Sequence, residues 1–430
     1  MIEALVGFAA FLLLAVFRIP LAFAMTIVGF LGFAYKVNFN AAAAMIGQIT
    51  FETGLSYTLS VIPLFILMGN FVVRSNLAAE LYHATYMFLG HRRGGLAMAT
   101  IVACGVFGAI CGSAIATTAT FTKVAFGPMR RFGYKNYLSA GAIATGGTLG
   151  ILIPPSIMFI IYGIMTDTSI GHLFVAGVVP GIIATIALCV TVWLIVLRDP
   201  AAGPPGERHS WAARFASLGP VWPILVLFLS VIGGIYGGAF TTTEGAGIGA
   251  AGAFLIALSR RSINLSMLIE VLIESVRITS MLFMVLIGAF IFSNFINFTS
   301  MPADLTAFIS RFVDHPLLVI LGICIVYIML GMAMEELSMV ALTVPLFFPV
   351  VMGLGYDPIW FGVIVVMICQ IGLTTPPVGM NVFVVKNLVP ELSLSEAFRG
   401  TWPFNFGLIL VLVLVIFFPQ LALYLPSFMK

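Results

Sequence analysis

The chain has 430 residues, of which 61% are hydrophobic and only 8% are charged, and its formal net charge is +3. This composition, with a mean hydropathy of +1.16, excludes the soluble globular classes and predicts a polytopic membrane protein. The five cysteines lie in apolar segments without a CxxC pair, and we interpret them as packing residues.

The first apolar run contains the acidic Glu3 and has no basic region or cleavage site. We therefore expect a retained membrane span, not a signal peptide. Apolar segments that suit helices continue along the chain. They are 2–17, 20–35, 57–73, 137–165, 171–197, 218–236, 240–258, 279–298, 359–386 and 402–427. Helices along the membrane interface are expected at the more polar stretches 39–56, 75–89, 262–277 and 302–315.

Two further apolar blocks, 94–128 and 317–350, are interrupted near their centres by small or polar residues. The interruption is Cys111-Gly112-Ser113 in the first block, and Met334-Glu335-Glu336 with Ser338 in the second. Each leg of about 15 residues is ~22 Å long as a helix, which is short for a hydrocarbon core of about 30 Å. We therefore predict two re-entrant helical hairpins.

Lys and Arg collect in four loops, which the positive-inside rule places in the cytoplasm. Ten of the 19 Lys and Arg residues lie in these loops, namely Arg92, Arg93, Arg130, Arg131, Lys135, Arg198, Arg208, Arg214, Arg260 and Arg261. The first hairpin must then enter and leave on the cytoplasmic face. Acidic residues outnumber basic ones beside the second hairpin, with Asp304, Asp314 and Asp357 against Arg311. We expect the second hairpin to enter from the opposite face.

Three sequence matches share one offset of 222 residues. They are Gly133-Tyr134 with Gly355-Tyr356, Gly150 with Gly372, and Pro154-Pro155 with Pro376-Pro377. The matches favour two inverted-topology repeats, 1–197 and 218–430, as in many secondary transporters. The segment 198–217 is rich in Pro and Gly and suits a cytoplasmic linker. The predicted fold is all-α, with about 10–12 transmembrane helices and the two hairpins.

The two Pro-Pro pairs predict breaks in the helices at 137–165 and 359–386, because proline lacks an N–H and restricts the residue before it. A break inside the membrane frees carbonyl groups for cations and N–H groups for carboxylates. Hard oxygen ligands with few fixed charges suit Na⁺. The candidate sodium- and substrate-binding residues are Gly112, Ser113, Gly147, Thr148, Gly150, Pro154, Pro155, Ser156, Glu335, Glu336, Ser338, Gly372, Thr374, Thr375, Pro376, Pro377 and Asn381. Sodium itself is expected at Ser113, Gly147, Thr148, Gly372, Thr374, Thr375 and nearby backbone carbonyls.

Simpler interpretations stay open for part of this set. Isolated Gly and Ser residues in membrane helices commonly serve close packing. Glu335 and Glu336 would either coordinate an ion or be solvated or capping groups at a wet hairpin tip. The sequence contains no Walker A, HExxH or GxSxG motif, so we expect no enzyme, no ATP-driven pump and no cofactor besides Na⁺ as coupling ion.

Longer motifs surround the hairpin tips and the breaks. They are Gly112-Ser113, Pro128-Met129 with Gly133-Tyr134, GTLGILIPPS from Gly147 to Ser156, LFVAG from Leu173 to Gly177 with Pro180-Gly181, and GLTTPPVGMN from Gly372 to Asn381. Over most of the chain these motifs resemble the large membrane (M) subunit of TRAP (tripartite ATP-independent periplasmic) transporters. Two positions depart from the pattern. Ala114 stands where the family often has Ser, and Thr242 stands where Pro is common.

The resemblance implies an elevator-type transporter that takes up a small organic acid, a carboxylate, by sodium-coupled secondary transport across a bacterial or archaeal inner membrane. It also implies a small membrane (Q) subunit and a periplasmic substrate-binding protein as partners, besides the lipid bilayer, and no nucleic acid. The alternatives are a standalone sodium/carboxylate carrier and a noncatalytic membrane scaffold or channel built on the same broken helices.

Overall fold

A computed structural model describes residues 2–309 and 315–429 of the chain. Arg311 and Asp314, which entered the topology argument, lie outside the described residues. Within the described ranges the secondary structure consists of helices and turns without a strand, so the all-α prediction is confirmed.

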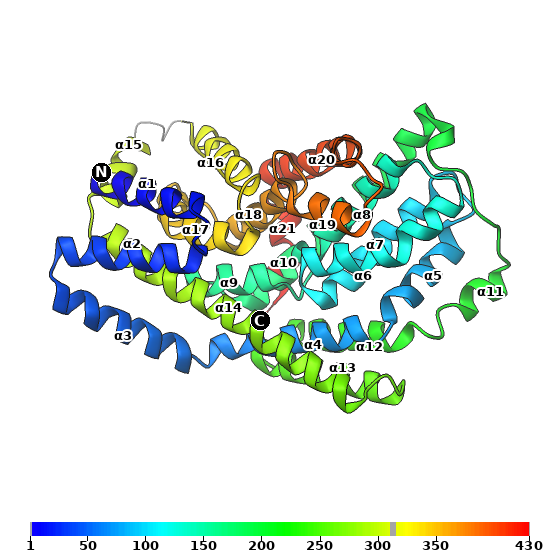
Figure 1. The fold of residues 1–430 in the computed structure, drawn as a ribbon, viewed down its shortest axis with the longest axis horizontal. Coiled ribbons are helices and arrows are strands. Elements are labelled where there is room, and N and C mark those ends of the chain that lie inside the picture. The colour runs from blue at the N-terminus through cyan, green and yellow to red at the C-terminus, as the bar shows by residue number, and fades with distance from the viewer. Residues whose placement is uncertain (1, 310–314, 430) are drawn as a thin grey trace.

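The helices of the first half lead to the end of the first predicted repeat (Figure 1). They are α1 (Ile2–Val16), α2 (Leu21–Lys36), α3 (Phe39–Leu55), α4 (Val61–Arg74), α5 (Leu77–Leu89), α6 (Gly95–Cys111), α7 (Ala114–Arg131), α8 (Asn136–Leu152), α9 (Ile157–Thr166) and α10 (Ile170–Arg198). The second half contains α11 (Trp211–Ala216), α12 (Trp222–Tyr236), α13 (Thr242–Ser259), α14 (Leu265–Asn297), α15 (Met301–Ile309), α16 (Pro316–Gly331), α17 (Glu336–Gly353), α18 (Pro358–Gly372), α19 (Met380–Leu388), α20 (Leu394–Phe417) and α21 (Gln420–Leu423).

Polar side chains cap many of these helices at their first turn. Asn38 accepts a hydrogen bond from the Ala41 N–H at the start of α3, and Asn264 accepts one from the Met267 N–H at the start of α14. Thr241 and Glu244 cap α13 reciprocally, since each side chain accepts from the other residue's backbone N–H. Such caps satisfy N–H groups that the helix itself leaves free.

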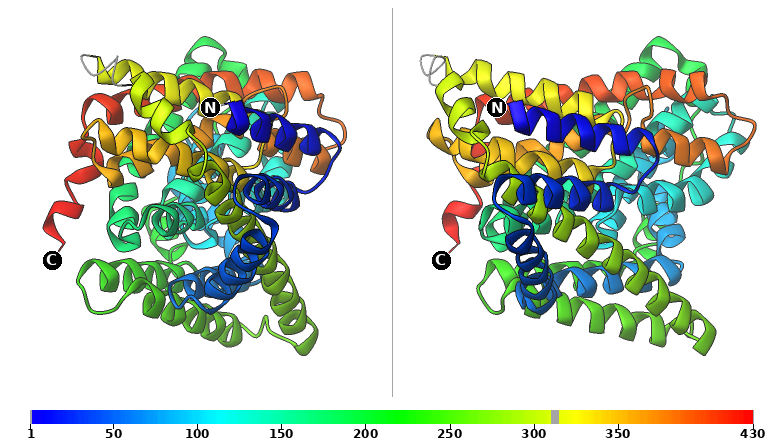
Figure 2. Two further views of the ribbon diagram at one scale, coloured as in Figure 1. Left: turned by 90° about the vertical axis from the view of Figure 1, so that its left-hand side faces the viewer. Right: turned by 60° about the vertical axis from the view of Figure 1, so that its left-hand side comes forward.

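Two sets of helices pack against each other. The core set is α6–α10 with α16–α20, in which α8 contacts α6, α7, α18, α19 and α20. The outer set is α1–α4 with α12–α14, where α14 runs along α2 and α13 along α4. Figure 1 shows the outer set along the left and lower sides of the molecule, and Figure 2 shows many helices roughly parallel in layers. Every residue of α8 from Leu138 to Leu152 is buried, so the core set is built around this helix.

The apolar helices of the described residues fall into a long and a short group. By length and composition, α10, α14, α17 and α20 are long enough to cross a membrane among the described residues, and counting the bent pairs α3–α4 and α8–α9 gives up to six. Six other apolar helices have 10–17 residues. The expected division between 262–277 and 279–298 is wrong, because no Gly or Pro interrupts α14 before Gly288 and the chain continues as one helix.

The linker 198–217 is fixed to the loops that precede α6 and α8. Gly94 N–H donates to the Gly203 carbonyl at 2.8 Å, and Lys135 N–H donates to the Ala202 carbonyl at 3.1 Å. The Lys135 ammonium also lies 2.5 Å from the Asp199 carboxylate, and this hydrogen-bonded ion pair lowers the pKa of Asp199 below its usual value. The linker therefore holds two basic loops in place.

Candidate functional site

The first hairpin consists of α6 and α7, which meet at Gly112-Ser113. Gly112 has φ of +65°, a left-handed conformation that favours glycine. Ser113 caps α7, since its Oγ accepts from the Ala116 N–H at 3.3 Å. A Cβ added to Gly112 would lie 3.4 Å from the Pro155 carbonyl oxygen. The tip of the first hairpin therefore lies beside the first Pro-Pro pair, as the sequence predicts.

The first break separates α8 from α9 by a bend of 41°. The Pro154–Pro155 peptide bond is cis, as is the Pro376–Pro377 bond in the second break. Ser156 donates to the Ile151 carbonyl at 2.5 Å and accepts from the Phe159 N–H at 3.5 Å. Its hydroxyl thus joins the two half-helices and caps α9, which limits what it can offer a ligand.

The tip of the second hairpin likewise lies beside the second break. Residues 332–335 connect α16 to α17, and residues 373–379 connect α18 to α19. The Val378 N–H, in the break, donates to the Met332 carbonyl at the hairpin tip, with a distance of 3.2 Å. The Asn381 N–H donates back across the break to the Leu373 carbonyl at 3.1 Å.

Glycines set the distance between each hairpin and the helix before its break. A Cβ on Gly150 would lie 3.0 Å from the Gly108 Cα, and a Cβ on Gly372 would lie 2.8 Å from the Gly331 Cα. These separations leave no room for a side chain without displacement of the neighbouring backbone. Gly150 and Gly372, predicted as ligand residues, therefore act as close-packing residues, whatever their carbonyls bind.

Two threonines of α7, Thr117 and Thr118, face α8 at the place where the sequence analysis expected Ser113 as a sodium ligand. A Cβ on Gly147 would lie 1.9 Å from the Thr118 Oγ1, and a Cβ on Gly150 would lie 3.2 Å from the Thr117 Oγ1. Both threonines are fully buried. Ser113 lies one turn earlier, at the helix cap. Thr117 and Thr118 were missed because the sequence does not indicate which face of α7 meets α8.

Residues from the second half reach the same turns of α8. The Gln370 amide donates to the Thr148 carbonyl at 2.9 Å, and the Asn381 amide donates to the Ala144 carbonyl at 3.0 Å. Both side chains are fully buried. We refer to Thr117, Thr118, Thr148, Gln370 and Asn381 as the polar cluster.

The polar cluster contains oxygen atoms that have no hydrogen-bond partner. In the described part of the chain, Thr117 Oγ1, Thr118 Oγ1, Gln370 Oε1 and Asn381 Oδ1 are all buried and unpaired. An unpaired buried oxygen is costly, most of all in a membrane. Hard, neutral hydroxyl and amide oxygens that face neighbouring turns of α8 suit a small monovalent cation. No cluster of three His, Cys, Asp or Glu residues that could hold a transition metal occurs within the described ranges.

The second break is held by α20, through residues that the sequence interpretation passed over. Asn405 accepts from the Thr374 hydroxyl at 2.6 Å and donates to the Thr375 hydroxyl at 3.1 Å. Thr401 donates to the Thr374 carbonyl at 3.0 Å. Asn405 is a polar residue in the predicted apolar segment 402–427, and this was the signal that could have identified it. Thr401 precedes that segment and had no such signal.

The two carboxylates of the second tip have different surroundings. Glu335 is half-buried at the N-cap of α17 and accepts from the Ser338 hydroxyl at 3.2 Å. Glu336 is only 8% exposed. Its Oε2 has no hydrogen-bond partner, and no basic residue in the described chain forms an ion pair with it. Simple solvation at a wet tip does not describe Glu336.

A comparison with known families shows to which family the chain with these broken helices belongs. The family model described as "Tripartite ATP-independent periplasmic transporter, DctM component" matches residues 8–421. The chain belongs to this family. It is thus a large permease of the TRAP type, a polytopic membrane protein whose relatives are transport proteins.

Individual relatives cover most of this large permease. The C4-dicarboxylate TRAP transporter large permease DctM of Pseudomonas aeruginosa is 36% identical over 381 residues, which is 88% of each chain. The sialic acid TRAP transporter large permease SiaM of Vibrio cholerae is 32% identical over 392 residues, 91% of this chain and 90% of the relative. The crystal structure of the Alcanivorax borkumensis YdaH transporter has a similar fold, with a TM-score of 0.60, 14% identity and 86% coverage of both chains.

Proposed function

We propose that this large permease couples sodium influx to the uptake of a small organic acid across the inner membrane of a bacterium or archaeon. The observation that carries the proposal is the polar cluster, whose four buried oxygens lack partners where both halves of the chain meet α8. A bound sodium ion would satisfy such oxygens, and binding would link the first half to the second. Ser113, Gly147, Gly372, Thr374 and Thr375 would contribute hydroxyl or carbonyl oxygens nearby.

The substrate class follows from the relatives and from the half-helices. C4-dicarboxylates and sialic acid, named for the two relatives above, are both carboxylates. The N-terminal ends of α7 and α9 lie side by side at Gly112 and Pro155. The ends of α17 and α19 are joined by the hydrogen bond from Val378 to Met332. Free N–H groups at such ends favour an anion, so they would hold a carboxylate between the hairpins.

The chain would work as two inverted repeats, 1–197 and 218–430, connected by the linker 198–217. Two features support this arrangement. Thr148 and Gln370, which hydrogen-bond to each other, are separated by the repeat offset of 222 residues, as residues near a pseudo-twofold axis would be. The contacts Gly108 with Gly150 and Gly331 with Gly372 also match between the halves. The core set would then move against the outer set in an elevator motion.

A small membrane (Q) subunit and a periplasmic substrate-binding protein would complete the transporter. The family name supports this inference, because it describes a tripartite system in which this chain corresponds to one component. The partners would bring the acid to the site, while the polar cluster supplies the coupling.

Reconstitution tests the proposal. Proteoliposomes that contain the large permease and its small subunit are given labelled dicarboxylates and other organic acids, with the binding protein present or omitted. We expect accumulation only with the binding protein present and an inward sodium gradient. Accumulation without the binding protein would indicate a standalone carrier. Gradient-independent flux would indicate a channel, and absence of flux with every acid would favour a scaffold.

A further inference from the structure

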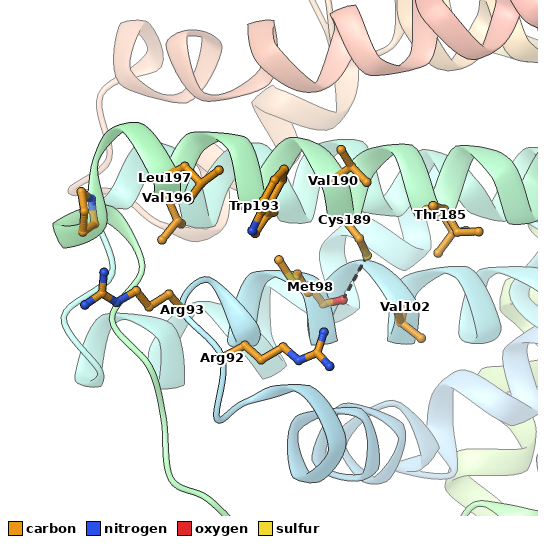
Figure 3. Close-up of a pocket in the computed structure, with 12 residues that line it drawn as sticks. Arg92, Arg93, Met98, Val102, Thr185, Cys189, Val190, Trp193, Val196 and Leu197 are labelled. Carbon is orange, nitrogen blue, oxygen red and sulfur yellow. Dashed lines mark hydrogen bonds between the residues drawn. The ribbon is translucent and has the colours of Figure 1, made fainter.

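An apolar groove with two arginines at one end runs along the surface between α6 and α10. Its wider part has a volume of about 560 Å³. Figure 3 shows Trp193 and Leu197 of α10 above Met98 of α6, with Arg92 and Arg93 near the loop that leads into α6. The positive-inside rule assigns this loop to the cytoplasm. Trp193, which is 52% exposed, has the position of a tryptophan at a membrane interface.

The groove continues away from the arginines towards the outer set. A second cavity of about 310 Å³ shares Val102, Thr185 and Ile186 with the first and reaches Leu225 and Phe228 of α12. Its lining is almost wholly apolar. Along α6, the distance from the arginine loop to Gly105 is roughly 18 Å at 1.5 Å per residue, close to the ~15 Å depth of one leaflet's hydrocarbon. The groove thus has the length of a single lipid chain.

The charges at its end are available to a ligand. Arg92 and Arg93 are exposed, and neither forms an ion pair with any carboxylate of the described residues. Other basic residues in these loops do have partners, as Arg130 has Glu391 and Lys135 has Asp199. Among the residues that the structure describes, no Asp or Glu lines either cavity.

The loop is also hydrogen-bonded to the linker and electropositive. The linker fixes it through the hydrogen bond from Gly94 to Gly203, 2.8 Å long. The pKa of His91, beside the loop, is lowered first by burial and then by the charges of Arg214 and Arg92. The contribution of the two arginines reflects the positive potential of the loop. Figure 3 shows the two guanidinium groups pointing in different directions from this loop, and each of them suits the oxygens of a phosphate group.

We propose that this groove binds an anionic phospholipid of the cytoplasmic leaflet. The phosphate lies against Arg92 and Arg93, and one acyl chain follows α6 and α10 past Val102 to α12. A protein helix about 10 Å wide occupies roughly 420 Å³ per turn. Neither cavity therefore holds much more than one helical turn. A slender acyl chain, in contrast, fits along both cavities. The lipid would contact the core set and the outer set together. This assignment does not depend on the transport proposal.

Native mass spectrometry of the purified full chain tests the assignment with phosphatidylglycerol and phosphatidylcholine of identical acyl chains. We expect the wild type to retain phosphatidylglycerol with about a tenfold preference, and R92Q/R93Q to lose that preference. R131Q/R261Q is the charge-matched control, because Arg131 ends α7 and Arg261 follows α13, both are exposed, and neither forms an ion pair within the described ranges. It should behave as the wild type.

A groove-filling variant separates the acyl chain from the headgroup. Val102 lines both cavities, so V102W should reduce phosphatidylglycerol retention while both arginines remain. Equal preference in R92Q/R93Q and the wild type would overturn the assignment. Inorganic phosphate that competes as well as the lipid would overturn it too, since the site would then be a simple anion site. Displacement of the lipid by the bound small subunit would show that a protein covers the groove instead.

Discussion

Asn381→Leu is expected to lower the initial rate of sodium-driven uptake by about tenfold or more. The Asn381 side chain is fully buried, its amide donates to the Ala144 carbonyl at 3.0 Å, and its Oδ1 is unpaired. Leucine has a similar size but removes both functions. The Ala144 carbonyl lies inside α8 and keeps its helical hydrogen bond, so the lost side-chain bond costs about 0.5–1.5 kcal/mol of stability. The lost oxygen weakens the coordination of the ion.

A matched variant and a second readout distinguish a lost ligand from a weakened fold. Asn294→Leu is the control, because the Asn294 amide donates to the Phe290 carbonyl of its own helix, α14, at 2.9 Å. It should transport almost normally. Thermal unfolding is measured in a Na⁺ buffer and, separately, in a K⁺ buffer of the same concentration. We expect Na⁺ to stabilise the wild type and Asn294→Leu but not Asn381→Leu. An Asn381→Leu protein that keeps wild-type uptake and full stabilisation by Na⁺ would place the ion elsewhere.

Glu336→Gln is expected to raise the sodium concentration for half-maximal uptake by about tenfold, which corresponds to about 1.4 kcal/mol of lost attraction. Glu336 is 8% exposed, with an unpaired Oε2 and no basic partner in the described chain. A buried carboxylate without such a partner either binds a proton or attracts a cation. Glutamine preserves the shape of the side chain and removes only the charge.

The sodium titration of uptake decides between these two states of Glu336. Glu52→Gln is the control, since Glu52 is exposed on α3 and accepts a hydrogen bond from Gln48 of the same helix. Its sodium dependence should equal that of the wild type. If Glu336→Gln also shows a wild-type sodium dependence, the carboxyl group is neutral in the transport cycle and does not attract the ion.

The parts of the site that depend on local chemistry could be predicted from the sequence. The Pro-Pro pairs imposed both breaks, and the short, interrupted apolar blocks marked both helix–turn–helix units. The predicted proximity of each tip to a break agrees with the contact of Gly112 with Pro155 and the hydrogen bond from Val378 to Met332. These features follow from backbone restrictions of single residues, which are independent of tertiary packing.

The polar cluster could not be assembled in this way. Thr118, Gln370 and Asn381 meet α8 from segments that are far apart in sequence, and the periodicity of a nearly all-apolar helix does not show which face is turned inward. The roles of Thr401 and Asn405 depend on how α20 crosses the second break. The exact bounds of the helices could not be predicted either, because hydropathy measures apolar length, while caps and breaks decide where each helix ends.

The most direct test of the central claim compares two cations in one experiment. The reconstituted transporter with its binding protein receives a labelled organic acid under an inward Na⁺ gradient or an equal K⁺ gradient, at constant ionic strength and with the membrane potential clamped. Our account predicts accumulation of the acid above its external concentration with Na⁺ alone. Equal accumulation with K⁺, or accumulation without a cation gradient, would contradict sodium coupling through the broken helices.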